Sequence, residues 1–209
     1  MSRGYFITLE GVEGVGKSTH LEFVRQLLID KGLSLIVTRE PGGTPVAEAI
    51  RRVLLAHHEE QMTAEAEVLL LFAGRAQHIY SVIKPALENG QTVLCDRFTD
   101  ATYAYQGDGR GVDKELIASL EKWINQQLIP DLTLLLDAPV KLALGRIKDR
   151  SADRFEVEDI EFFQRIRQGY LARAALYPKR FRVIDAGASI EAVQQQIASA
   201  IDSFFKERL

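Results

Sequence analysis

The chain has 209 residues, a hydrophobic fraction of 46% and a formal net charge of −3. This length fits one α/β domain over residues 1–209, and the mild negative charge excludes a general nucleic-acid or membrane surface. One cysteine excludes a disulfide framework, and charged residues interrupt any N-terminal signal peptide, so we expect a soluble cytoplasmic protein without nucleic-acid or membrane partners.

The first predicted strand, Tyr5 to Leu9, leads into a glycine-rich loop and then a helix. The loop has the spacing G-x-x-x-x-G-K-S, with the residues Gly11, Val12, Glu13, Gly14, Val15, Gly16, Lys17 and Ser18. Backbone N–H groups of such a loop surround phosphate oxygens, and the following helix adds the positive end of its dipole. Lys17 would reach the terminal phosphates and the Ser18 hydroxyl would ligate Mg²⁺. The sequence therefore predicts a site for a nucleoside triphosphate with Mg²⁺.

Strand and helix patterns alternate along the rest of the chain. Further strands are expected at Leu33–Thr38, Thr92–Asp96, Leu132–Asp137 and Phe181–Ile184. Helices are expected at Val46–Ala56, Ala64–Glu88 with bends near Gly74 and Pro85, Thr99–Gln106, Lys114–Gln127, Leu142–Lys148, Asp159–Leu176 and Ile190–Phe205, with the glycine-rich stretch 107–111 as a loop and Cys95 and Trp123 in the core. The alternation predicts a five-stranded, doubly wound parallel sheet with helices on both faces.

Polar residues follow the strands, at the edge where such sheets bind ligands. Asp96 ends the third strand, where a carboxylate can hold Mg²⁺; a helix N-cap is the alternative. Arg97 follows and suits a second anionic substrate, although an ion pair with Asp96 or Glu40 would also explain it.

Further arginines lie after the second and fourth strands. Arg39 and Arg51 are candidates to bind a phosphate, and of Arg51 and Arg52 we expect only one to do so. A later run spaces Arg146, Arg150 and Arg154 four residues apart, which puts them on one helix face. This run is either a solvated surface or an arginine-rich lid at about residues 145–155 that closes over ATP.

Two function classes fit a phosphate-binding loop: a kinase of small phosphate-bearing substrates and a GTPase-type regulatory module. The second needs an Asn-Lys-x-Asp run, but the fourth strand leads into Asp137-Ala138-Pro139-Val140. A nucleoside monophosphate kinase needs no strong general base, because its acceptor oxygen is already anionic. The scarcity of candidate bases therefore favours such a kinase.

The chain resembles the bacterial thymidylate kinases essentially from end to end, and four segments carry the resemblance. They are the run 10–19 ending in Ser18-Thr19, Thr38-Arg39-Glu40-Pro41-Gly42-Gly43-Thr44, Asp96-Arg97-Phe98, and Ala104-Tyr105-Gln106-Gly107 with Gly109-Arg110-Gly111. The resemblance implies transfer of the ATP γ-phosphoryl group to dTMP with Mg²⁺, with another nucleoside monophosphate as the alternative acceptor.

The resemblance also implies roles for individual residues. Catalytic roles fall on Lys17, Asp96, Arg97 and Arg150; ATP binding on residues 11–19, Arg146 and Arg154; metal binding on Ser18 and Asp96; and dTMP binding on Glu13, Arg39, Arg51, Phe72, Arg75, Arg97, Thr102, Tyr105 and Gln106. Because Glu13 and Val15 leave the loop without a basic residue before Lys17, the transition-state arginine is expected from the run 146–154.

The family places a phenylalanine four residues before its base-binding arginine, where this chain has Leu71. Phe72, three residues before Arg75, is the favoured ring against the thymine, with Leu71 as a possible apolar substitute. The resemblance further implies a homodimer, for which the helical stretch Ala66–Ile83 is a plausible interface.

Overall fold

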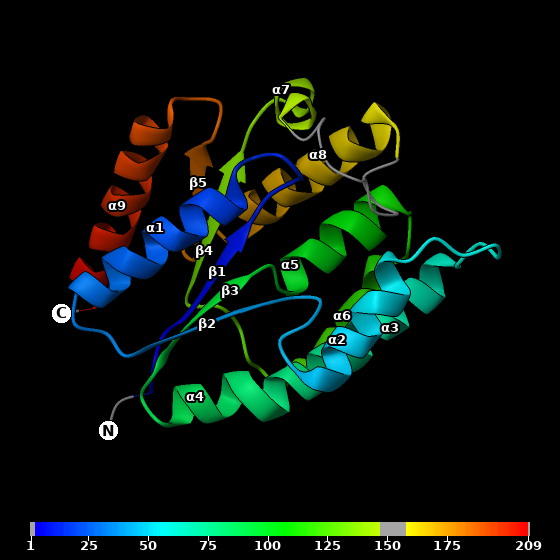
Figure 1. Ribbon diagram of the computed structural model, residues 1–209, viewed down its shortest axis with the longest axis horizontal. Helices are drawn as coiled ribbons and strands as arrows, with labels where there is room; N and C mark the ends of the chain where they lie inside the picture. The colour runs from blue at the N-terminus through cyan, green and yellow to red at the C-terminus, as the bar shows by residue number, and fades with distance from the viewer. Residues whose placement is uncertain (1–2, 147–157, 209) are drawn as a thin grey trace.

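The computed structural model describes residues 3–146 and 158–208, and within them the five predicted strands form one parallel sheet. The strand order is β2-β3-β1-β4-β5, and every neighbouring pair is parallel. The strands are β1 (Phe6–Glu10), β2 (Leu35–Arg39), β3 (Thr92–Asp96), β4 (Leu132–Asp137) and β5 (Phe181–Asp185). The predicted fold class is therefore confirmed (Figure 1).

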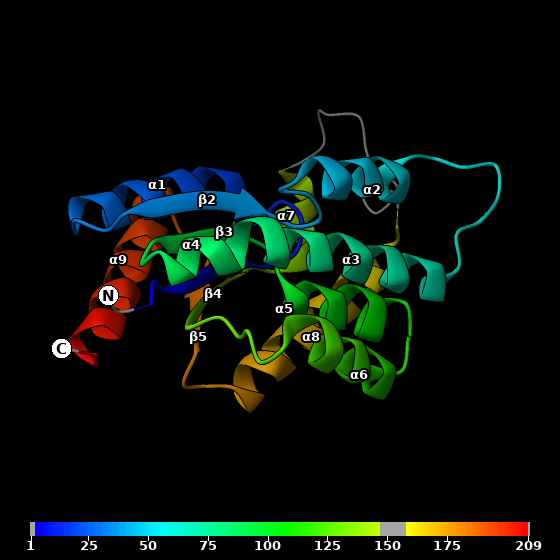
Figure 2. The same cartoon turned by 90° about the horizontal axis from the view of Figure 1, so that it is seen from below.

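Helices cover both faces of this sheet. They are α1 (Lys17–Asp30), α2 (Pro45–Leu55), α3 (Ala64–His78), η1 (Ile79–Ile83), α4 (Lys84–Glu88), α5 (Thr99–Thr102), η2 (Tyr103–Gly109), α6 (Lys114–Asn125), α7 (Val140–Gly145), α8 (Ile160–Leu176) and α9 (Ile190–Lys206). Figure 2 shows α1 on one side of the strands and α6 and α8 on the other. No described helix has the length and apolar character needed to cross a lipid bilayer.

The central strand β1 places the ends of its neighbours next to the glycine-rich loop. Its residues are buried throughout, as expected for a strand covered on both faces. Leu9 is in register with Asp96, and Asp96 with Arg39 on the next strand. Because all three strands are parallel, Arg39, Asp96 and the loop after β1 lie at one edge of the sheet.

Two π-helical segments depart from the predicted elements. The helix predicted over residues 64–88 is continuous through η1, whose wider turn lies between the expected bends at Gly74 and Pro85. Gly107 and Gly109, expected in a loop, continue the helix as η2. A Cβ on Gly109 would lie 2.8 Å from the Phe162 ring, so the missing side chain lets η2 pack closely against α8.

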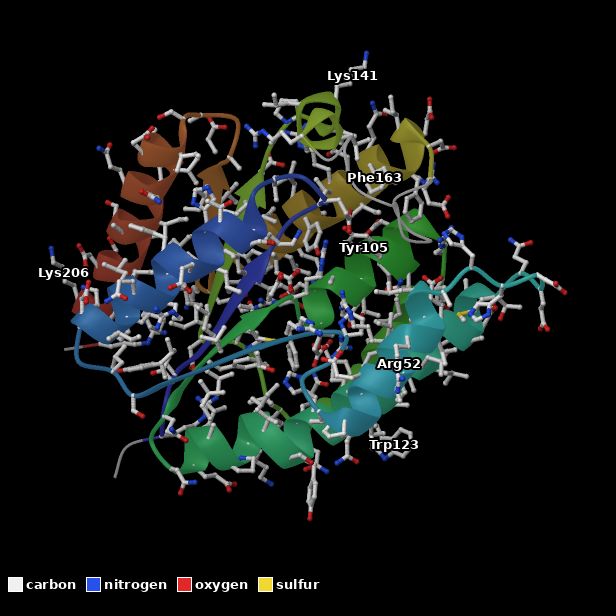
Figure 3. All side chains as sticks on the ribbon, in the orientation of Figure 1. Arg52, Tyr105, Trp123, Lys141, Phe163 and Lys206 are labelled. Atoms are coloured by element: carbon white, nitrogen blue, oxygen red, sulfur yellow. The ribbon has the colours of Figure 1, made fainter. Side chains whose placement is uncertain are left out.

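The predicted core position of Trp123 is wrong. The residue is 72% exposed and projects from the surface of α6 (Figure 3). Ile117 on the same helix is fully buried, and Leu120 and Ile124 pack beside it. The buried face of α6 is thus complete without Trp123, which lies on the opposite side. Cys95, by contrast, is buried as predicted.

Candidate active site

The glycine-rich loop leads into α1 and leaves the first backbone N–H groups of that helix without a side-chain partner among the described residues. Gly11, Gly14 and Gly16 all have positive φ, and a Cβ on Gly14 would collide with the Ala143 carbonyl at 1.9 Å. Within the described chain, α1 has no side-chain cap and no acidic residue in its first turn. Its first N–H groups and dipole are therefore available to an anion.

Lys17 folds back over this loop. Its Nζ donates to the carbonyl oxygens of Gly11 and Val12 at 3.0 and 2.9 Å. Burial, followed by the neighbouring charge of Arg97, lowers the pKa of Lys17 to about 8. An anionic phosphate at this position would favour the charged ammonium group.

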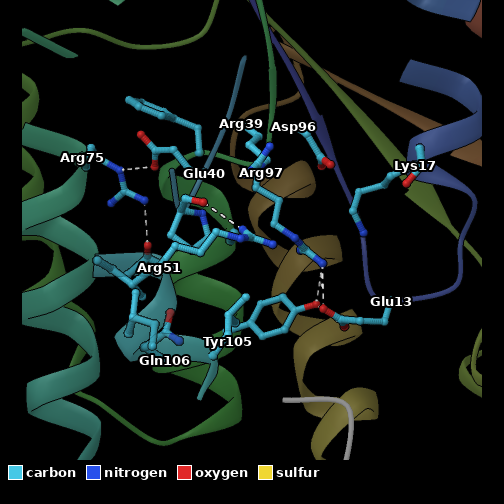
Figure 4. Close-up of a pocket in the computed structure, with 18 of the residues that line it drawn as sticks. Glu13, Lys17, Arg39, Glu40, Arg51, Arg75, Asp96, Arg97, Tyr105 and Gln106 are labelled. Carbon is cyan, nitrogen blue, oxygen red and sulfur yellow. Dashed lines mark hydrogen bonds and ion pairs between the residues drawn. The ribbon is translucent and has the colours of Figure 1, made fainter. Parts of the chain in front are cut away.

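Arg97 is bonded to four groups at the centre of the site. It has a φ of 67°, uncommon for a residue with a side chain. Its Nη1 donates to the Gly11 carbonyl at 2.9 Å and the Tyr170 hydroxyl at 3.0 Å, and its Nη2 to Glu13 at 2.8 Å and the Tyr105 hydroxyl at 3.0 Å. The Tyr105 hydroxyl in turn donates to Glu13 (Figure 4). The ion-pair partner of Arg97 is thus Glu13, not Asp96 or Glu40.

Asp96 has the properties of a cation ligand. It lines the same cavity as Ser18, and its Oδ1 is buried without a hydrogen-bond partner among the described residues. The helix α5 takes Phe98 as its N-cap residue, so the N-cap alternative for Asp96 is wrong. Residues 3–146 and 158–208 contain no group of three or more His, Cys, Asp or Glu side chains placed to hold a metal. A Mg²⁺ ion at Asp96 and Ser18 would complete its coordination with phosphate oxygens and water, as this ion commonly does.

The far end of the cavity is built around Arg75, which is 2% exposed. Its Nε donates to Glu40 Oε2 at 2.7 Å and its Nη2 to Thr102 Oγ1 at 3.0 Å. Nη1 is buried and has no partner in the described part of the chain. Gln106 is held nearby by a 2.6 Å hydrogen bond from its amide nitrogen to Glu67. Arg75 therefore offers a fixed donor, and Gln106 an amide, to a bound molecule.

The structure favours Leu71 over Phe72, the ring preferred from the sequence, as the side chain that lies against a base. Phe72 is 2% exposed, belongs to a core cluster with Val68, Tyr103 and Ile117, and does not line the cavity. Leu71 does line it. Both residues are close to Arg75 along α3. The ring of Phe72, however, lies beneath the guanidinium group, with its centre 4.7 Å from Arg75 Cζ.

Phe98 is a ring in the cavity that the sequence reasoning did not assign. It follows Arg97, is 1% exposed and lines the cavity. The sequence signal that could have identified Phe98 was its place in the segment Asp96-Arg97-Phe98, which resembles the thymidylate kinases.

The arginines after β2 both reach the cavity. Arg39 Nη2 bonds both carboxylate oxygens of Glu48 at 2.9 Å, and Arg51 Nη1 donates to the Pro41 carbonyl at 2.8 Å. Both line the cavity, whereas Arg52 does not. One of the adjacent pair 51–52 therefore faces the site, and the phosphate contact expected of it stays a prediction.

The cavity has a volume of about 410 Å³ and extends from the glycine-rich loop to α3. Thr19 and Arg146 also line it, and Arg146 donates to the Ala186 carbonyl at 3.1 Å. Val12 and Val15 instead pack into the core at 3% and 1% exposure. Arg150 and Arg154 lie outside the described residues, so their expected roles stay predictions.

Glu10 is a buried acid that the sequence reasoning did not single out. Its Oε1 accepts from the Phe98 N–H at 2.7 Å and its Oε2 from the Tyr170 hydroxyl at 2.8 Å. Burial, followed by the charge of Asp100, raises the pKa of Glu10 to about 8. A charged residue at the end of an apolar strand was the signal that could have identified it.

Comparison with known proteins points to one family. The sequence model of the thymidylate kinase family matches residues 9–197. The thymidylate kinase of Pseudomonas putida (strain GB-1) is 54% identical over 195 residues, covering 93% of each chain. That of Chromohalobacter salexigens is 56% identical over 202 residues, covering 95% of each. The crystal structure of thymidylate kinase from Ehrlichia chaffeensis superposes with a TM-score of 0.78 at 31% identity, covering 95% of this chain and 99% of that one.

Proposed function

The chain belongs to the thymidylate kinase family and transfers a phosphoryl group from ATP to dTMP, and we propose that the cavity described above binds both substrates. ATP occupies the end at the glycine-rich loop, and dTMP the end at Arg75. The observation that carries this proposal is the single cavity that joins Lys17 to Arg75.

At the donor end, backbone N–H groups of the loop and α1 bind the ATP phosphates. Lys17 exchanges its two carbonyl contacts for phosphate oxygens. Asp96 and Ser18 would hold Mg²⁺, a role supported by the buried Asp96 Oδ1, which has no hydrogen-bond partner among the described residues. When bound, Mg²⁺ neutralises the charge that develops on the phosphate oxygens.

At the acceptor end, Arg75 reads the thymine. An arginine side chain can only donate, so the free Nη1 selects a carbonyl oxygen on the base. Thr102 fixes this guanidinium group and Gln106 adds an amide contact to the base edge. Leu71 contributes an apolar surface against the pyrimidine.

Between the two ends, Arg97 and Glu13 align the reacting groups. Arg97, with Arg39 and Arg51, contacts the dTMP phosphate, and Glu13 faces the deoxyribose. Tyr105 packs beside the sugar, where a 2′-hydroxyl would be disfavoured. The phosphate oxygen of dTMP is already anionic, so these residues position charge and need not remove a proton.

The proposal is tested by measuring ADP release and nucleoside diphosphate formation with ATP and each of dTMP, dUMP, dCMP and dGMP. We expect dTMP to give the highest kcat/KM and dTDP as product. Preferred turnover of a purine monophosphate would contradict the acceptor assignment.

We also propose that the protein is cytoplasmic. Its one cysteine, Cys95, is a free thiol, as expected in a reducing compartment.

We also propose that two copies of the chain pair through α3 and α6. These helices contact each other and expose Leu69, Tyr80 (on the adjoining η1), Leu116 and Trp123 at 58, 77, 44 and 72%. Such exposed apolar residues on neighbouring helices fit a self-association surface. Leu69→Glu should yield a monomer in light scattering, while Ile190→Glu, on α9, should not. A monomeric wild-type protein would contradict this proposal.

A further inference from the structure

The fully buried His78 links two segments that form the acceptor end of the cavity. Its Nδ1 lies 3.1 Å from Glu40 Oε1, and its Nε2 lies 2.7 Å from Thr38 Oγ1. Because a carboxylate can only accept, Nδ1 carries the proton and donates to Glu40. His78, on α3, thus fixes the side chain of Glu40, the first residue after β2.

The backbone of that loop is in direct contact with the imidazole. A Cβ on Gly43, whose φ is 87°, would lie 2.5 Å from His78 Nε2 and 2.7 Å from Thr38 Oγ1. Only glycine allows this approach. The imidazole therefore sets the distance between α3 and the loop as well as the orientation of Glu40.

Glu40 passes this constraint on to Arg75. Its Oε1 is bonded to His78 and its Oε2 accepts from Arg75 Nε at 2.7 Å. Arg75 and His78 are three residues apart on α3, so they lie on the same helix face. All three side chains are at most 6% exposed, so losing one of these bonds is costly.

We propose that His78 is a positioning residue for pyrimidine specificity: through Nδ1 it fixes Glu40, and Glu40 fixes the Arg75 guanidinium so that Nη1 meets a carbonyl group on the base. The inference rests on the proposed function, in which Arg75 reads the thymine. A base with an amino group at that position presents a donor to a donor and is rejected. If Glu40 turned away, Arg75 would keep, among the described residues, only its Thr102 bond, and the rejection would weaken.

Two amide variants separate the two nitrogens of His78. The amide nitrogen of asparagine is as many bonds from the backbone as Nδ1, and that of glutamine as many as Nε2. His78→Asn therefore retains a donor toward Glu40, whereas His78→Gln places its amide toward Thr38 and leaves no donor toward Glu40. Both remove the ring that contacts Gly43, so both should lower the thermal midpoint by similar amounts.

The kinetic effects should differ. For His78→Gln we expect the KM for dTMP to rise roughly tenfold, and the dTMP over dCMP preference in kcat/KM to fall by a similar factor, as for a lost hydrogen bond to a charged group. His78→Asn should stay within about twofold of wild type in both, on the same reasoning. The KM for ATP should be unchanged in both variants, because the donor end is bound by other residues.

Glu40→Gln supplies a second measurement. It should reproduce the His78→Gln phenotype, and combining the two should add little, because both act on Arg75 through one path. Equal effects of His78→Asn and His78→Gln on dTMP selectivity, or full additivity with Glu40→Gln, would overturn the inference. A wild-type enzyme without preference for dTMP would instead overturn the proposed function, so the two failures are distinguishable.

Discussion

Replacing Leu71 and Phe72 one at a time tests which side chain meets the thymine. The two are adjacent on α3, but only Leu71 lines the cavity, and Phe72 is 2% exposed within a core cluster. The structure therefore predicts that Leu71→Ala acts mainly on dTMP binding and Phe72→Ala mainly on stability.

The expected losses of stability and of dTMP binding follow from what each side chain contacts. Removing the buried Phe72 ring should cost about 3–5 kcal/mol of unfolding free energy. For a chain of this length, that lowers the thermal midpoint by roughly 10 °C. Leu71→Ala removes apolar contact with the base worth about 1–2 kcal/mol, which corresponds to a KM for dTMP raised by roughly tenfold.

The assays are calorimetric unfolding without nucleotide and steady-state kinetics with varied dTMP. The kinetics are measured well below the thermal midpoint of the weaker variant, so that only folded enzyme is compared. Phe72→Leu is the matched control, because it keeps an apolar side chain beneath Arg75 and should lose less stability. The reasoning is refuted if Phe72→Ala raises the KM for dTMP tenfold while Leu71→Ala leaves it unchanged.

Three other predictions concern the centre of the site. Asp96→Asn should lower kcat by at least tenfold and raise the Mg²⁺ concentration for half-maximal rate, because a neutral amide is a poorer cation ligand; an unchanged Mg²⁺ titration would contradict the assignment. Tyr105→Ala should raise kcat/KM for the ribonucleotide relative to dTMP, and an unaltered ratio would remove its proposed role. Glu10 has its folded-state pKa raised to about 8, so the folded protein binds a proton more tightly than the unfolded chain. Its contribution to stability is present below the ordinary carboxyl pKa and is lost as the pH rises through 8. The wild-type unfolding free energy should therefore decline from about pH 5 to 8 relative to Glu10→Gln, at up to about 1.4 kcal/mol per pH unit; parallel pH profiles would contradict this.

Features encoded by short stretches of sequence were predictable. The glycine spacing before Lys17 requires a phosphate loop, and apolar runs between helical patterns require parallel strands. Asp96 and Arg97 could be assigned to the site because parallel strands end at one edge of the sheet. In each case the deciding information lies within a few residues of the feature.

Features that depend on which face of a helix meets which neighbour were not predictable. Phe72 and Leu71 fit the same helical spacing, and only the packing of α3 against η2 and α6 decides between them. Trp123 is a large aromatic residue of a type expected in a core, but it lies on the outer face of α6. Glu10 and His78 have functional surroundings only because distant segments bring them a tyrosine and a glutamate.

The central claim is that one cavity holds dTMP at Arg75 and the ATP phosphates at Lys17. A crystal structure with dTMP and a non-hydrolysable ATP analogue tests it most directly. We expect the thymine carbonyl oxygen within hydrogen-bond distance of Arg75 Nη1, the dTMP phosphate beside Arg97, and the analogue's phosphates in the glycine-rich loop. A thymine ring away from Arg75, or a dTMP phosphate that does not face the terminal phosphate of the analogue, would contradict the account.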